Sequence, residues 1–72
     1  MAWKHIANPC EMGVERTDGR QVSIIHMGGE DYDAEFDVCV YDADYNQLDK
    51  LGDDVDMEEA WSLTRAYTKA NP

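Results

Sequence analysis

Long apolar runs, basic residues and cysteines are all scarce in this chain of 72 residues. No apolar stretch approaches the roughly 18 residues of a membrane-spanning helix. The start, MAWKHIANPC, also lacks the charged-then-apolar layout of a signal peptide. We therefore expect no membrane partner, and a protein that stays in the cytoplasm where it is made.

The two cysteines, Cys10 and Cys39, are too few for the disulfide framework of a small secreted protein. A reducing cytosol would keep both as thiols. Neither cysteine forms a C-x-x-C pair, and His5 and His26 form no H-x-x-x-H pair. Such scattered residues are typical of independent side chains, so we expect no metal centre and no cofactor.

Basic residues number 6 against 16 acidic ones, which gives a net charge of −10. Nucleic acid and anionic membranes repel such a chain, so neither is expected to bind it directly. Thirteen of the 16 acids lie between Glu30 and Glu59, a stretch whose only base is Lys50. A basic protein surface is therefore the expected partner.

The chain is expected to fold as a single domain over residues 1–72, because it contains no repeat, linker or low-complexity tract. Its hydrophobic content of 43% is sufficient for a small core and too high for a disordered acidic tail. A chain this short buries only about 60% of its unfolded surface. Both a monomer and a homodimer are therefore possible states.

Two alternating runs, CEMGVER and RQVSIIHM, flank Thr17-Asp18-Gly19 and predict a hairpin. A two-residue turn would mix apolar and polar residues on each face. A three-residue loop with Gly19 in the left-handed conformation instead places Val14 opposite Val22, which gives one apolar face. The same register leaves Ile25 and Met27 on the other face, pointing outward.

Alternation resumes over residues 30–42, EDYDAEFDVCVYD, and predicts a third strand with one core face and one acidic face. The expected core face consists of Tyr32, Ala34, Phe36, Val38 and Val40. The expected opposite face consists of Asp33, Glu35, Asp37, Cys39 and Tyr41. A short fourth strand at the edge is expected over QLDKL, residues 47–51.

The segment DMEEAWSLTRAYTKANP, residues 56–72, predicts a C-terminal helix. Asp56 is the expected N-cap, with Glu59 three residues later as in a capping box. Trp61, on the apolar stripe, is expected to be its main core anchor. The predicted fold class is α+β, with a three- to four-stranded antiparallel sheet and a C-terminal helix packed on one face.

The stretch DADYNQLDKLGD, residues 42–53, superficially resembles a calcium-binding loop. An EF-hand requires Gly at its sixth place, Glu at its twelfth and helices on both sides. Gln47 and Asp53 occupy those places here, and a strand precedes the loop. We therefore predict a turn, because Asp and Asn side chains accept hydrogen bonds from nearby backbone N–H groups.

Asp33, Glu35 and Asp37 would project from one strand face at intervals of about 6.6–6.8 Å. This spacing approximates that of phosphates along a nucleic-acid strand. Asp53, Asp54 and Glu58 would extend the acidic surface around its rim. Together with nearby tyrosines, these acids predict a partner-binding surface. Its candidate residues are Asp33, Glu35, Asp37, Tyr41, Asp42, Asp44 and Tyr45.

A small acidic chain with the carboxylate-rich strand DYDAEFD, the turn DADYN and no catalytic motif resembles the small phage-encoded inhibitors that imitate nucleic acid, anti-CRISPR proteins among them. The resemblance concerns general character and assigns no individual residue. It implies a DNA mimic, present in the host cytoplasm, that inhibits a host defence complex.

Two functions follow as hypotheses. The first is a non-catalytic inhibitor that occupies the basic nucleic-acid-binding surface of a CRISPR-Cas-like complex by charge mimicry. The alternative is a small accessory or regulatory module that binds another protein, or a second copy of itself, through apolar residues such as Ile25 and Met27. In the alternative, the negative charge serves only solubility.

Overall fold

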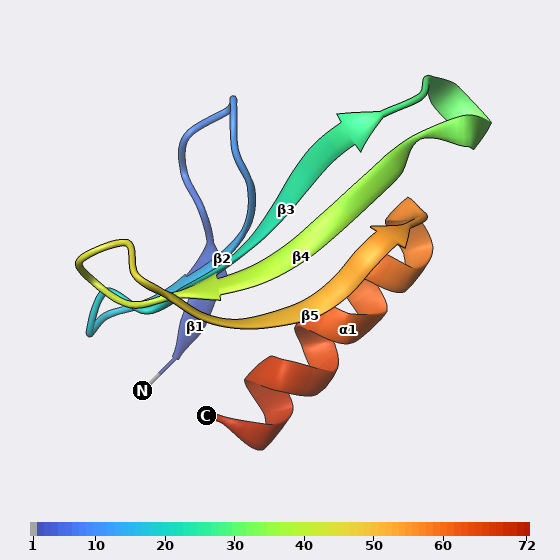
Figure 1. Cartoon of the computed structure of the whole chain (residues 1–72). Coiled ribbons are helices and arrows are strands. Elements are labelled where there is room, and N and C mark those ends of the chain that lie inside the picture. The colour runs from blue at the N-terminus through green and yellow to red at the C-terminus, as the bar shows by residue number, and fades with distance from the viewer. Residues whose placement is uncertain (1) are drawn as a thin grey trace.

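The protein is an α+β fold in which a five-stranded antiparallel sheet packs against one C-terminal helix. The computed structural model describes residues 2–72, and Figure 1 shows their arrangement. The strands follow one another in the sheet in chain order. The elements are β1 (Trp3–His5), β2 (Met12–Arg16), β3 (Gln21–Gly28), the 3-10 turn η1 (Asp31–Asp33), β4 (Glu35–Tyr41), β5 (Gln47–Val55) and α1 (Met57–Ala70).

The predicted register of the first hairpin is confirmed. Val14 pairs with Val22, and Met12 pairs with Ile24, so one face of β2 and β3 is apolar. The backbone N–H of Arg16 donates to the carbonyl oxygen of Arg20 at 2.8 Å, which leaves a loop of three residues between this pair. Gly19 in this loop adopts a φ of 94°, a conformation that costs glycine little. Its backbone N–H donates to the carbonyl oxygen of Arg16 at 3.0 Å, which closes the turn.

The prediction of three to four strands was wrong, because it missed β1. This strand has only three residues, too few to show alternation, and pairs Trp3 with Arg16 of β2. A long-range contact also holds it: the indole N–H of Trp3 donates to the carbonyl oxygen of Asn71 at 2.7 Å. Tertiary contacts of this kind leave no mark on the local sequence pattern.

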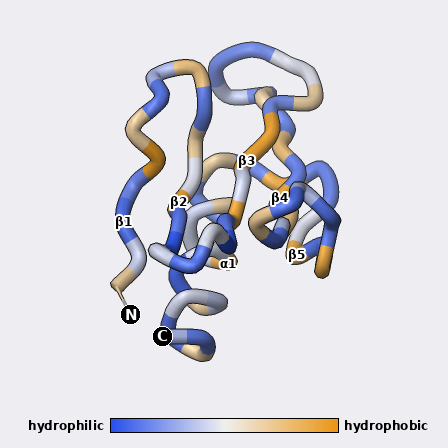
Figure 2. Tube along the Cα trace, turned by 90° about the vertical axis from the view of Figure 1, so that its left-hand side faces the viewer, coloured by the Kyte–Doolittle hydropathy of each residue, from blue (hydrophilic) through white to orange (hydrophobic). Residues whose placement is uncertain are grey.

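The core lies between the sheet and α1, where β3 and β4 contribute most of the buried side chains. Figure 2 shows the hydrophobic stretches of these two strands near the middle of the molecule. The buried members of the core are Val22, Ile24, Phe36, Val38, Val40 and Ala60.

Trp61 is not the main core anchor that was expected. Ala60 and Thr64 are the buried residues of α1, whereas Trp61 is only half-buried and packs at the side of the core. Its ring meets the His5 ring edge-on, with 5.6 Å between the centroids. Small side chains therefore face the sheet directly and allow the helix to approach it closely.

The predicted helix start is confirmed. Asp56 Oδ1 accepts a hydrogen bond from the backbone N–H of Glu59 at 2.7 Å, which is the bond expected of an N-cap. Lys69 lies in the last turn, where the helix dipole favours a cation. The cap fixes the point at which the chain leaves β5 and enters α1.

The third predicted strand is shorter than expected, because β4 begins at Glu35. Asp31, Tyr32 and Asp33 instead form the 3-10 turn η1, in which Asp31 has a φ of 53°. Tyr32 is fully exposed rather than packed on the core face. The glycine pair Gly28-Gly29 ends β3, so the following residues belong to a connection and not to a strand.

The edge strand β5 is longer than the predicted segment and continues to Val55. Three irregularities interrupt its pairing with β4, and Asp54 adopts a φ of 53°. Such bulges bend an edge strand and discourage another chain from pairing with it.

Candidate functional site

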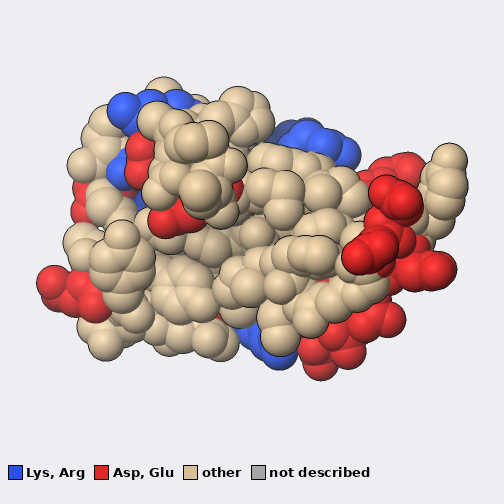
Figure 3. Space-filling model, turned by 90° about the horizontal axis from the view of Figure 1, so that it is seen from above, with Lys and Arg blue, Asp and Glu red and all other residues tan. Residues whose placement is uncertain are grey.

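One end of the molecule carries a dense group of carboxylates, which we call the acidic tip. The connection between β3 and β4 lies beside the end of β5 and the start of α1 in Figure 1, and each segment contributes acids. Figure 3 shows the carboxylates gathered at this end. All members are exposed: Glu30, Asp31, Asp33, Glu35, Asp54, Asp56, Glu58 and Glu59.

No Lys, Arg or His neutralises the acidic tip. Among residues 2–72, the ion pairs involve only Arg16 with Asp18, and Lys50 with Asp37 and Asp53. The tip therefore holds eight of the 16 acidic residues without a paired cation. Asp56, Glu58 and Glu59 are partly compensated by the positive end of the α1 dipole, but the other five are not. The field at this end is strongly negative.

Tyr32 lies among the residues of the acidic tip. Its side chain is fully exposed, and it borders two shallow grooves. One groove is lined mainly by acids, including Asp33 and Glu59. The other is more apolar and includes Met57, which is 39% exposed. An exposed aromatic ring surrounded by charge is the arrangement that protein interfaces use as an anchor.

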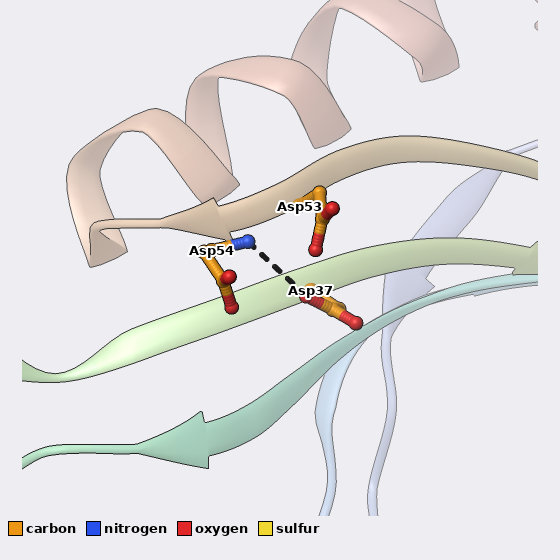
Figure 4. Close-up of side chains that lie close together, drawn as sticks. All are labelled: Asp37, Asp53 and Asp54. Atoms are coloured by element: carbon orange, nitrogen blue, oxygen red, sulfur yellow. Dashed lines mark hydrogen bonds between the residues drawn. The ribbon is translucent and has the colours of Figure 1, made fainter.

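Asp37 does not belong to an exposed acidic face, contrary to expectation. It is 8% exposed, and its Oδ1 accepts a hydrogen bond from the backbone N–H of Asp54 at 3.2 Å (Figure 4). Its Oδ2 lies 3.2 Å from Lys50 Nζ. The Asp54 N–H foremost, and then the Lys50 ammonium, hold the pKa of the Asp37 carboxyl below its usual value, although burial opposes them. This carboxylate serves the fold.

Asp37, Asp53 and Asp54 form the group most similar to a metal site in the described part of the chain. One carboxylate oxygen from each lies within 4.8 Å of the others. However, Lys50 Nζ already lies 3.4 Å from Asp53 Oδ1 as well as close to Asp37. The ammonium group supplies the positive charge that the cluster needs, so the arrangement is an ion-pair network.

The stretch DADYN forms a turn, as predicted. Asp42 Oδ1 accepts hydrogen bonds from the backbone N–H groups of Asp44 and Asn46, both at 2.9 Å. The Asn46 N–H foremost lowers the pKa of the Asp42 carboxyl. Tyr45 takes the left-handed conformation, with a φ of 63°, and its side chain is 72% exposed. The carboxylate that would begin a calcium loop is therefore used to close the hairpin.

The predicted site residues separate into three locations. Asp33 and Glu35 belong to the acidic tip, and Asp37 lies in the ion-pair network. Asp42, Asp44 and Tyr45 lie in the turn at the opposite end of β4, next to the half-buried Tyr41. The seven residues therefore do not form one continuous surface.

Sequence reasoning did not include Glu30, Asp31, Met57 and two helix-start acids, Asp56 and Glu59, in the site. The signal available was the acidic run GGEDYD directly after a strand-ending glycine pair. Successive antiparallel strands run in opposite directions, so β3 and β5 end at the same end of the sheet. The connection after β3 therefore lies near the start of the helix. An interpretation of GGEDYD as a connection would have placed Glu30 and Asp31 in one site with Asp56, Met57 and Glu59.

The other face of the sheet shows the predicted apolar exposure. Ile25 is 36% exposed and Met27 is 55% exposed. Cys10 is an exposed thiol, whereas Cys39 is buried in the sheet. Within residues 2–72, no helix has the length and apolar character that a membrane crossing needs.

Comparisons with known proteins give no relative: no family model, no curated protein and no solved structure matches the chain.

Proposed function

We propose that this protein is a non-catalytic inhibitor whose acidic tip occupies the basic, nucleic-acid-binding surface of a partner protein. The observation that carries the proposal is the gathering of eight exposed carboxylates at one end, with no basic side chain of residues 2–72 paired to them. Complementary charge steers such a protein to a basic surface and makes association fast.

Solubility alone does not account for this distribution. A net charge of about 2–8 suffices for a small domain, and this chain carries −10. Crowding half of the acids at one end adds repulsion between them without improving solubility further. A function that uses the local field explains the arrangement better.

The tip resembles a phosphate backbone in charge rather than in regular spacing. Carboxylates from three segments line the two grooves that Tyr32 borders, so the exposed ring of Tyr32 would enter a gap between Lys or Arg side chains of the partner. A partner held in this way loses access to nucleic acid. The general resemblance to phage-encoded inhibitors makes a CRISPR-Cas-like defence complex the partner that we propose.

Two triple variants of equal charge test the site. The first, Asp31→Asn with Asp33→Asn and Glu35→Gln, neutralises part of the tip. The second, Glu15→Gln with Asp18→Asn and Asp49→Asn, removes the same charge elsewhere. Asn suits position 31 because it tolerates the positive φ.

The assay is capture from a lysate of the bacterial host at low salt, with duplex DNA as competitor. We expect the wild type to retain a nucleic-acid-binding complex that DNA or high salt releases. The tip variant should lose it, and the control variant should keep it. Equal loss in both variants, or capture that neither DNA nor salt affects, would contradict the proposal.

A second candidate function has one supporting observation. Ile25 and Met27 are exposed on the sheet face away from α1, which is typical of an interface in an accessory module or homodimer. Sedimentation at several concentrations separates the candidates. A dimer that Met27→Gln disrupts would favour the accessory module.

A further inference from the structure

The sheet face away from α1 contains a hollow that the acidic tip does not use. Gln21, Ser23 and Ile25 of β3, with Tyr41 of β4, line its floor. These residues alternate with Val22, Ile24 and Val40, which face the core and α1. Cys10 and Glu11 from the β1–β2 connection, and Tyr45 from the β4–β5 turn, border it.

The hollow is largely apolar and open. Ile25 and Tyr45 are both exposed at its lining, and α1 packs only on the opposite face, chiefly against β4 and β5. Met27, the next outward residue of β3, extends the apolar surface toward the acidic tip. Because the site lies on an open sheet face, it suits a side chain of another protein better than a small molecule, which needs enclosure.

Charges around the hollow determine which occupant fits. Carboxylates of the acidic tip lie beyond one end of β3 and β4, Asp44 lies beyond the other end, and Glu11 stands in the wall. Two lysines share this face: Lys50 is held by Asp37 and Asp53, and Lys4 lies on β1 opposite Glu15. His26 also lines the hollow. A second copy of the chain would bring another charge of −10 to the same place, so repulsion disfavours a homodimer here.

We propose that this hollow receives an apolar side chain from a short segment of the basic partner, with Lys or Arg on both sides of that side chain. The inference rests on the proposed function, since the same partner supplies both contacts. The flanking cations would face the acidic tip and the β4–β5 turn, while the apolar centre lies against Ile25 and Tyr45. Charge thus aligns the segment, and the hollow selects among basic segments.

Two fluorescent peptides test the proposal on the whole chain. One has Phe-Ser-Leu-Ser-Phe between two Lys-Lys-Lys flanks, and the other has Ser-Gly-Ser-Gly-Ser between the same flanks. Anisotropy at low and high salt should give an affinity for the apolar peptide at least about tenfold higher, the factor that burial of one large apolar side chain supplies. This ratio should persist at high salt, because it does not depend on charge.

Matched variants locate the contact. Ile25→Thr with Tyr45→Asn removes the apolar lining, and both replacements suit their backbone, since Thr favours strands and Asn tolerates the positive φ of position 45. Leu48→Thr is the control, because Leu48 is 49% exposed but does not line the hollow. The lining variant should bind both peptides with similar affinity, whereas the control should keep the preference of the wild type for the apolar peptide.

The thiol of Cys10 gives an independent readout. Cys10 is exposed at the hollow and Cys39 is buried, so a thiol reagent reports on Cys10 in the folded protein. The apolar peptide should slow this reaction, and the Ser-Gly peptide should not.

The outcomes separate the two proposals. Equal affinity for both peptides, with binding at low salt, would overturn the hollow and leave the acidic tip intact. Binding of the apolar peptide that salt does not weaken, with no binding of the Ser-Gly peptide at low salt, would support the hollow and contradict charge mimicry. A dimer in which Cys10 is already protected would overturn the proposed occupant.

Discussion

The Asp37 carboxylate accepts the backbone N–H of Asp54, a residue 17 positions later that has a left-handed φ of 53°. Phe36 pairs with Val55 while Val38 pairs with Gly52, so β5 contains a bulge opposite Asp37. The bulge turns the N–H of Asp54 toward β4, and the buried carboxylate satisfies it. A negative side chain in the sheet therefore compensates an irregularity of the neighbouring strand.

This bond predicts a pH-dependent contribution to stability. The pKa of Asp37 is lowered in the folded protein, so its stabilising effect is complete above the ordinary Asp value of about 3.9. The effect should disappear as the pH falls through the lower folded value, because protonation removes the charge that Lys50 and the Asp54 N–H stabilise.

The measurement is urea unfolding of wild type and Asp37→Asn between pH 7 and pH 2.5. Acid also relieves repulsion at the acidic tip, so the difference between the two proteins is the relevant quantity. We expect a lower free energy of unfolding for the variant at pH 7 and a shrinking difference in acid. A difference that stays constant with pH would show that the Asp37 charge is unimportant.

The N-cap of α1 predicts a second effect. Replacement of Asp56 by Ala removes the acceptor for the Glu59 N–H and should lower the free energy of unfolding by about 1 kcal/mol. Asp56→Asn keeps an acceptor and should cost much less. Chemical denaturation at pH 7 compares them. Equal losses would indicate that the charge at this position matters more than the cap.

Gly13 predicts a third and larger effect. It has a φ of 140°, and a Cβ atom here would overlap the carbonyl oxygen of Val22. Gly13→Ala should therefore destabilise the protein by about 3 kcal/mol or more. Gly28→Ala is the matched control, because nothing lies near its Cβ position and its φ is not in the left-handed range. Thermal melting followed by circular dichroism should leave the control nearly unchanged.

Calcium should have little effect on stability. Asp42 is committed to the backbone of its own turn, and the sequence lacks the Glu and Gly that tight calcium loops require. A site with a dissociation constant near 1 mM would add only about 0.4 kcal/mol at ~1 mM calcium. Melting curves in chelator and in calcium test this. A large rise in melting temperature, abolished by Asp44→Asn, would contradict the prediction.

Local patterns in the sequence predicted those parts of the fold that depend on neighbouring residues. The loop at Gly19, the Asp56 cap and the Asp42 turn are examples, because short-range bonds determine each of them. The strand β1 and the position of Asp37 depend on contacts more than ten residues away, so alternation could not reveal them.

The candidate site was only partly predicted for a related reason. Asp33 and Glu35 were identified, but alternation extended their strand back through Tyr32 and missed the 3-10 turn. The acids of β5 and α1 join them only through the three-dimensional fold. Charge clustering was readable from the sequence, whereas the surface that it forms was not.

The bond between Trp3 and the Asn71 carbonyl brings the two ends of the chain together at the C-terminal end of α1, away from the acidic tip. A fluorophore, affinity handle or surface tether attached at either end would therefore leave the tip facing outward. A circular permutant with a short linker between these ends is also geometrically feasible. Opening that permutant at Gly29 would free one end of the segment that carries Glu30, Asp31 and Asp33 while preserving every pairing of the sheet. It would therefore test whether the tip needs this connection to be closed.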